Sequence, residues 1–255
     1  MTVLTTTIET TAPLRDGEDP FTQKMPTLDE IRGWIPKECF EKNLITSLSY
    51  MFVDYAILAA LIYNEPHFAA FGIIGQMFWV FIMGMMVSAL FCIGHDCGHS
   101  TFSNYTWVND LVGHLTHGMI WCPYWPWQKS HRQHHTYTSH IKKDRGHGWT
   151  TKDKYVEYDP FTKWFAYSSA TACVRWIIYT VAGIPDGSHF WPLGEMFSNT
   201  KERIQCAVSV SVNVAFSVFF WHLFGGWAGW FKFWVLPVLG HSYWIIMITY
   251  MQHQT

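Results

Sequence analysis

The sequence has few charged residues. Asp, Glu, Lys and Arg make up only 14% of its 255 residues, which is about half of the usual share in a soluble domain. The formal net charge is −2, and no run of Lys and Arg interleaved with aromatic residues stands out. We therefore expect no nucleic-acid partner, because binding to the phosphate backbone needs a basic patch.

The sequence also lacks a cysteine framework and a leader. Its six cysteines form no CxxC pair, which argues against a zinc ribbon and against a disulfide scaffold. Residues 1–44 are polar and contain no short apolar core followed by a cleavage site, as a signal peptide would have. We expect this segment to be a cytosolic N-terminal arm, followed by one membrane domain over residues 45–255.

What the sequence does have is long apolar runs. Aromatic residues reach 18%, with 15 tryptophans among them, a composition typical of membrane proteins, in which Trp and Tyr form interfacial belts. We assign residues such as Trp125 and Trp127 to these belts. A 19-residue helix is about 28 Å long, close to the thickness of a bilayer core. Four segments are long enough to cross: 45–63, 68–94, 204–224 and 233–251.

The four spans pair into two hairpins. The first pair is joined by the short turn 64–67 and the second pair by a turn at residues 225–227, with Pro237 and Gly240 expected to bend the last helix. Two shorter apolar stretches, 111–121 and 165–182, are predicted to be interfacial or re-entrant helices. The predicted fold class is therefore an all-α integral membrane protein with about four transmembrane helices and a histidine-rich region between the hairpins.

The distribution of positive charge predicts the orientation in the membrane. Five Lys and Arg residues precede the first span, eleven lie between the second and third spans, and one, Lys232, lies in the remaining loop. The positive-inside rule then places both termini and the central region in the cytosol. His95, the central region and His253 would all lie on this face.

Two histidine clusters have the spacing of metal ligands. His95 and His99 are four residues apart, so a helix would place both imidazoles on one face. In the second cluster His131 aligns with His134 and His135, which diverge from each other by about 100°. Imidazole binds zinc, copper, nickel and iron, so the spacing alone does not select the metal.

The motifs around these histidines identify a family. The segments 95–103 (HDCGHSTFS), 109–114 (NDLVGH) and 123–135 (PYWPWQKSHRQHH) resemble the membrane-bound fatty acid desaturases, most closely the methyl-end group of Δ12 and ω3 acyl-lipid desaturases. Segments 142–144 (KKD), 186–190 (DGSHF), 201–203 (KER) and 248–253 (ITYMQH) fit the same pattern. The resemblance extends from about Trp34 to the last residue.

This resemblance implies an O₂-dependent desaturase of fatty acyl chains in the endoplasmic reticulum membrane. It implies a non-haem centre of two iron ions, electrons from cytochrome b5 or a similar donor, and a fatty acyl substrate on phospholipid or CoA. The implied iron ligands are His95, His99, His131, His134, His135 and His253. A cytochrome b5 segment of the HPGG type is absent from the sequence, so the donor would be a separate protein; an oligomer with itself or another chain stays open.

The sequence departs from the family at its third histidine box, because it ends two residues after His253. Six histidines do not fill two octahedral irons, so we expect little or no desaturase activity from this polypeptide alone, as a fragment or a truncated form. The choice between Δ12 and ω3 chemistry, the acyl carrier and the residues that line an acyl tunnel cannot be read from the sequence.

Four further residues are candidates for supporting roles. Asp96 and Asp144 are expected to orient ligating imidazoles through their free N–H groups, and His114 and His117 are expected to pack near the site rather than to bind metal. Two alternative functions remain: a catalytically silent, desaturase-like membrane protein, and a membrane electron carrier that binds haem through two histidines.

Overall fold

The computed structural model describes residues 26–138, 140–144, 150–182 and 188–252, and these residues contain helices and no strand. They divide into two compact units, residues 1–41 and 42–255. In the first unit, α1 (Leu28–Trp34) begins with a capping box in which the side chains of Thr27 and Glu30 each bond the other residue's backbone N–H. The helix is followed by the 3₁₀ turn η2 (Lys37–Phe40).

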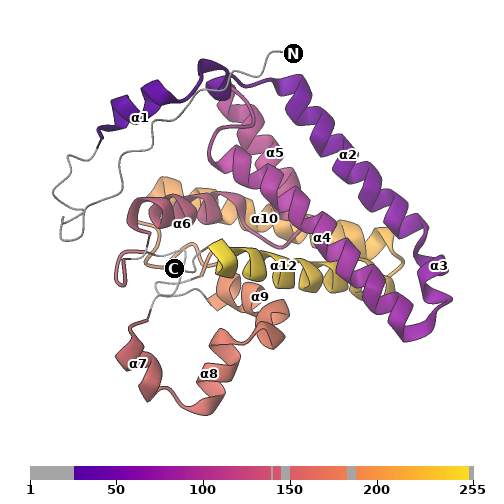
Figure 1. Cartoon of the computed structure of the whole chain (residues 1–255). Coiled ribbons are helices and arrows are strands. Elements are labelled where there is room, and N and C mark those ends of the chain that lie inside the picture. The colour runs from indigo at the N-terminus through magenta and orange to yellow at the C-terminus, as the bar shows by residue number, and fades with distance from the viewer. Residues whose placement is uncertain (1–25, 139, 145–149, 183–187, 253–255) are drawn as a thin grey trace, which may run out of the picture. The chain divides into compact units, whose positions relative to one another are not determined.

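Four helices of the second unit are long and apolar enough to cross a membrane. They are α2 (Leu44–Tyr63), α4 (Gly72–Gly98), α10 (Thr200–Leu223) and the continuous helical stretch Trp227–Gln252, which contains α11 (Trp227–Trp230), η4 (Phe231–Val235) and α12 (Leu236–Gln252). The all-α membrane fold with two helical hairpins is therefore confirmed. Figure 1 shows α2 and α4 as one hairpin and the amber to yellow α10 and α12 as the other.

The helix that contains most of the second predicted span, 68–94, has different bounds from that span. Residues 68–71 belong to the short helix α3 (Glu65–Ala69) and the turn after it, and α4 begins only at Gly72, whose φ of +64° breaks the helix. At the other end α4 continues to Gly98, because the residues after Gly94 still form helical hydrogen bonds. His95 therefore lies within the helix and His99 caps it.

The helices that contain the third and fourth predicted spans also begin before residues 204 and 233. Asn199 caps α10 by accepting a hydrogen bond from the N–H of Glu202, so the charged residues 201–203 form its first turn. Between the two helices Gly225 and Gly226 have φ of +74° and +99°, which suits glycine. The bend expected at Pro237 and Gly240 stays a prediction. A π-helical turn, η4, ends at Val235, two residues before Pro237; π-turns often occur as single turns inside α-helices.

Shorter helices connect the hairpins. They are α5 (Thr106–Gly118), α6 (Tyr124–Tyr137), α7 (Lys152–Glu157), α8 (Pro160–Tyr167), the 3₁₀ turn η3 (Ser169–Thr171) and α9 (Ala172–Ala182). The 13 residues of α5 and the 11 of α9 are too few to cross a bilayer core. In the structure α5 packs against α4, and α9 packs against α12.

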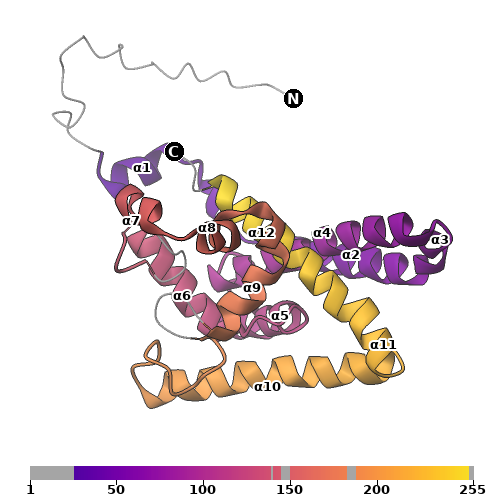
Figure 2. The same ribbon diagram turned by 90° about the horizontal axis from the view of Figure 1, so that it is seen from below.

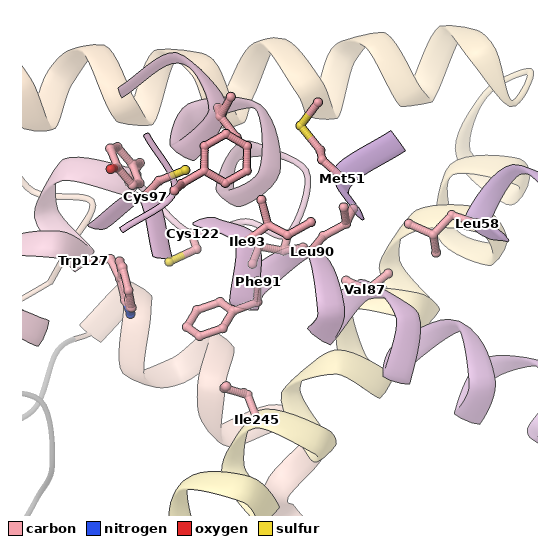
Figure 3. Packing of buried hydrophobic residues seen from close by; sticks show 14 of the residues in the cluster. Met51, Leu58, Val87, Leu90, Phe91, Ile93, Cys97, Cys122, Trp127 and Ile245 are labelled. Carbon is pink, nitrogen blue, oxygen red and sulfur yellow. The ribbon is translucent and has the colours of Figure 1, made fainter. Parts of the chain in front are cut away.

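The hydrophobic core lies where α4 meets α2, α5, α6 and α12 (Figure 3). Met51 and Leu58 come from α2, while Ile245 comes from α12, and all three are buried beside the inner face of α4. The outer faces of the spans instead expose large apolar side chains, such as Ile73 and Phe78 of α4. This arrangement suits helices that are solvated by lipid.

Three consecutive residues of α12 each fix a different contact. A Cβ atom at Gly84 of α4 would lie 2.4 Å from the carbonyl carbon of Gly240, so the two backbones touch. The next residue, His241, bonds Ser88 Oγ through Nδ1 at 2.9 Å, and Ser242 Oγ donates to the carbonyl of Ala172. Small residues of this kind allow close packing of helices in membranes.

Candidate metal centre

The last turn of α4 carries the first histidine pair. His95 and His99 are one helical turn apart, and their ring centroids are 4.5 Å apart. His99 is the C-cap of α4, and its own N–H still bonds the carbonyl of His95. The helix therefore extends far enough to orient both rings, as the i, i+4 spacing predicts.

The second histidine pair lies on α6 and faces the first. Nε2 of His131 lies 3.1 Å from Nε2 of His99 and 3.0 Å from Nε2 of His135. Together with His95, these residues offer four ligand nitrogens that all lie within 4.8 Å of one another. The structure thus brings together four of the six histidines that the sequence singled out.

The distances between these nitrogens fit a shared metal ion. A bond between imidazole and a first-row metal is about 2.1 Å long, so two nitrogens at right angles on one ion lie about 3 Å apart. The nitrogens must also be unprotonated to bind. Burial, reinforced by the neighbouring imidazoles His95 and His135, lowers the pKa of His99 to about 4 and that of His131 to about 2. Both rings are therefore neutral at pH 7 and have a lone pair to donate.

His134 lies beside this group but turns a different way. Its Nδ1 is 2.9 Å from both carboxylate oxygens of Asp144, which is only 1% exposed. Its ring centroid lies 5.6 Å from that of His135 and 6.0 Å from that of His131. A carboxylate on one ring nitrogen fixes the orientation of the ring. The sixth predicted ligand, His253, lies outside the described residues.

Asp96 and the other two supporting candidates lie in different places. Asp96 Oδ1 is 3.4 Å from Nδ1 of His95, and the carboxylate is largely exposed. Both ring nitrogens of His114 have partners in the protein, the carbonyl of Asp110 at 2.7 Å and Ser209 Oγ at 2.9 Å. His114 thus joins α5 to α10 and has no ring nitrogen available for a metal.

His117 is completely buried and lies behind the metal cluster. Its ring stacks on Phe91 at 4.8 Å, and Nε2 lies 3.3 Å from the carbonyl of that residue. Burial lowers the pKa of His117 to about 3, so the ring is neutral. Its ring meets Trp127 edge-on with a centroid distance of 4.5 Å, and Trp127 in turn stacks on His131.

The prediction that Trp127 lies in an interfacial belt is wrong. Trp127 is 4% exposed and stacks on His131 with a centroid distance of 4.6 Å and an interplanar angle of 17°. Figure 3 shows it at the edge of the buried core. One feature of the sequence indicates this contact. Trp127 lies four residues before His131, so both side chains lie on one face of α6.

Comparisons with known proteins agree with this geometry. The family model for fatty acid desaturases matches residues 73–255. A Δ12 fatty acid desaturase of Caenorhabditis elegans is 43% identical over 91% of this chain and 62% of its own length, and an ω3 fatty acid desaturase of the same organism is 36% identical over 92% and 59%. An sn-1 acyl-lipid ω3 desaturase (ferredoxin) of Nostoc is 31% identical over 97% and 69%. The chain thus spans about three fifths of the length of the two nematode relatives.

Proposed function

Because the chain belongs to the fatty acid desaturase family, within the group that contains Δ12 and ω3 enzymes, we propose that the protein introduces a cis double bond of the Δ12 or ω3 type into a fatty acyl chain. The observation that carries the proposal is the group of four imidazoles from α4 and α6. Identity to the two nematode enzymes and to an acyl-lipid enzyme of Nostoc supports the same reaction.

In this proposal the histidines hold two iron ions. His95, His99, His131 and His135 form the described part of the ligand set, and His134 and His253 add to it. Bound iron supplies the O₂-derived oxidant that is needed to break an unactivated C–H bond, since no side chain can do so. A separate donor such as cytochrome b5 would supply the electrons.

The protein's own contribution is to hold the imidazoles neutral and fixed. Trp127 covers one face of His131, while Asp144 holds His134 through Nδ1. Both α4 and α6 present their histidines as i, i+4 pairs, which limits each ring to a few rotamers. A site built on two packed helices keeps the ligands in place better than one built on loops.

The membrane orientation belongs to the same proposal. The C-terminal end of the second span carries His95 and His99, and the N-terminal end of the third span carries Lys201 and Arg203. Nine of the 17 Lys and Arg residues lie between these two helices. Together with Lys201 and Arg203, they favour a cytosolic histidine face and cytosolic termini by the positive-inside rule. The endoplasmic reticulum is the membrane we propose.

Measurement of bound iron tests the metal centre directly. The purified chain from iron-replete cells should contain close to two irons, and His131→Ala should lose most of it. His114→Ala is the matched control, because the carbonyl of Asp110 and Ser209 Oγ occupy both ring nitrogens of this histidine, so its loss should leave the iron content unchanged. A chain without iron would contradict the proposal and would favour the catalytically silent alternative.

Activity and haem binding need separate readouts. Any dienoic or trienoic acyl chains that form in yeast cells expressing the protein should disappear with His131→Ala; products that persist in this variant would contradict the proposed site. A strong Soret band would favour the haem alternative. The structure disfavours the haem alternative. The ring nitrogen of His131 lies only 3.0–3.1 Å from those of His99 and His135, which leaves no room for a haem between these rings.

A further inference from the structure

A cavity of about 560 Å³ lies between α6 and the first turns of α10, within the volume range of known ligand sites. Figure 2 shows the start of α10 beside α6. An ion pair of 2.5 Å between Lys129 and Glu202 joins the two helices there. Most of the other lining side chains are charged or carry amides: Gln128, Arg132, Gln133, Asn199, Lys201 and Gln205.

The cavity lies on the opposite side of α6 from the metal cluster. At about 100° per residue, Trp127, His131 and His135 fall on one face of this helix. Lys129, Arg132 and Gln133, which line the cavity, lie about 100–200° around the helix from His131. The cavity is therefore a site separate from the histidines, although the same helix forms one wall of each.

The charges in the cavity do not balance. Glu202 neutralises Lys129, and hydrogen bonds from the N–H and Oγ of Ser198 also hold its carboxylate. Arg132 and Lys201 form no ion pair with any residue that the structure describes. The cavity thus carries two uncompensated positive charges, which suits an anion with several acceptor oxygens.

A separate apolar groove lies farther along α10. It has a volume of about 300 Å³ and is lined by Val212, Ala215, Phe216 and Phe219. On an ideal helix Lys201, Val212 and Phe219 lie within about 40° of one another, so one stripe of α10 leads from the cavity to the groove. The step from Gln205 to Val212 is seven residues, or about 10 Å, and Val208, 43% exposed, lies between them.

We propose that this stripe binds a membrane glycerophospholipid. Its phosphate lies in the cavity against Arg132 and Lys201, and one acyl chain follows α10 into the apolar groove. The site is positively charged at one end and apolar at the other. This combination favours an amphiphile over a soluble anion, because a soluble anion would make no contact with the apolar groove. The cavity lies at the N-terminal end of a spanning helix. The ends of such a helix lie at the level of the lipid phosphates in the membrane. The site does not depend on the metal centre.

Photocrosslinking of the full chain in detergent micelles tests this site. The probe is a phosphatidylcholine with a diazirine in one acyl chain, titrated at increasing mole fraction. We expect saturable labelling of residues 208–219. Lys201→Gln should raise the half-saturating mole fraction about five- to tenfold, as expected for the loss of a charge-assisted hydrogen bond, and adding Arg132→Gln should raise it further.

Matched variants separate loss of binding from loss of fold. Arg203 lies two residues after Lys201 in α10, is exposed and does not line the cavity. The half-saturating mole fraction of Arg203→Gln should therefore stay within about twofold of the wild-type value. Lys201→Arg should retain binding. Gel filtration and the unfolding temperature check that each variant is folded; a folded Lys201→Gln protein that binds like Arg203→Gln would overturn the proposal.

Competitors identify what is recognised. Unlabelled phosphatidylcholine should displace the probe, whereas diacylglycerol, which lacks the phosphate, should compete at least about fivefold less well. Equal competition by diacylglycerol would show that only the apolar groove binds. Full displacement by inorganic phosphate would show a soluble-anion site. Labelling confined to other helices would place the lipid elsewhere, and each of these three results would overturn the proposal.

Discussion

Nδ1 of His134 lies 2.9 Å from each carboxylate oxygen of the buried Asp144. The contact spans ten residues and joins α6 to the segment that follows it. It fixes the orientation of one imidazole next to the four that converge. A metal ligand is commonly oriented in this way by a group that does not touch the metal.

Asp144→Asn should therefore weaken iron binding without abolishing the fold. We expect the affinity for iron, measured by competition with a chelator, to fall about 10- to 100-fold, because an amide is uncharged and has only one acceptor oxygen in place of two. Asp96→Asn is the matched control. Asp96 lies 3.4 Å from its histidine and is 59% exposed, so its replacement should have a much smaller effect; equal effects would show that the buried contact is not special.

Trp127→Leu should cost both stability and iron. The indole fills the space between His131, His117 and Phe91, and a smaller side chain leaves a cavity there. We expect a loss of roughly 2–4 kcal/mol in the free energy of unfolding and faster release of iron. Trp107→Leu, at a site that is 67% exposed, should change neither the unfolding temperature nor the iron content.

Gly84→Ala should destabilise the packing of α4 against α12. A Cβ atom there would overlap the backbone of Gly240, which cannot move aside as a flexible side chain could. Forced separation of two packed helices costs about 1–3 kcal/mol, which thermal unfolding in micelles would measure. Met85→Ala, on the exposed side of the same turn, is the control. An unchanged unfolding temperature in Gly84→Ala would contradict the close contact.

A buried ion pair ties the two hairpins together at their far ends. Glu65 of α3 is 4% exposed and lies 2.7 Å from Nζ of Lys232 in η4. Gln76 also donates to this carboxylate. A double-mutant cycle with Glu65→Gln and Lys232→Met should give a coupling of about 1–2 kcal/mol. Additive effects of the two substitutions would show that the pair contributes no stability.

The same carboxylate predicts a dependence on pH. Burial alone would raise the pKa of Glu65, but the hydrogen bonds from Lys232 and Gln76 outweigh it and lower the pKa below its usual value. Because the pKa of Glu65 is lower in the folded state than in the unfolded state, its ionised carboxylate stabilises the fold at pH values above the unfolded pKa of about 4.3. This stabilisation is lost as the pH falls through the pKa of Glu65 in the folded state. The unfolding temperature of the wild type should thus decrease more below about pH 4 than that of Glu65→Gln; parallel curves would contradict this.

The elements that could be predicted from the sequence are those with local causes. Continuous apolar runs predict spans, and the i, i+4 spacing predicts that His95 lies with His99 and His131 with His135. The helices differ in extent from the predicted spans near residues 68 and 233. Hydropathy does not distinguish the apolar turn at 70–71 from a helix, and it does not show that the helix around Lys232 already begins at Trp227. The capping of α10 by Asn199 was a readable signal that hydropathy ignores.

What could not be predicted depends on contacts between distant segments. The i, i+4 spacing puts Trp127 on the same face of α6 as His131, but it does not show whether the ring is buried or faces lipid, since a belt tryptophan and a buried one have the same composition signal. The contact of Gly84 with Gly240 joins residues that are 156 positions apart. Only the packed arrangement of α4 and α12 shows that these two glycines are adjacent.

The π-helical turn Phe231–Val235 determines where the fourth span, Trp227–Gln252, can lose a residue without a change in its packing. A π-turn holds one residue more than α-helical geometry requires. Deletion of one residue within it would leave a regular α-helix and keep the register of Gly240, His241 and Ser242 with their partners. A deletion anywhere later, before Gly240, would rotate that end of the helix by about 100°. The fourth span thus contains one place where its length is adjustable and a following stretch where it is not.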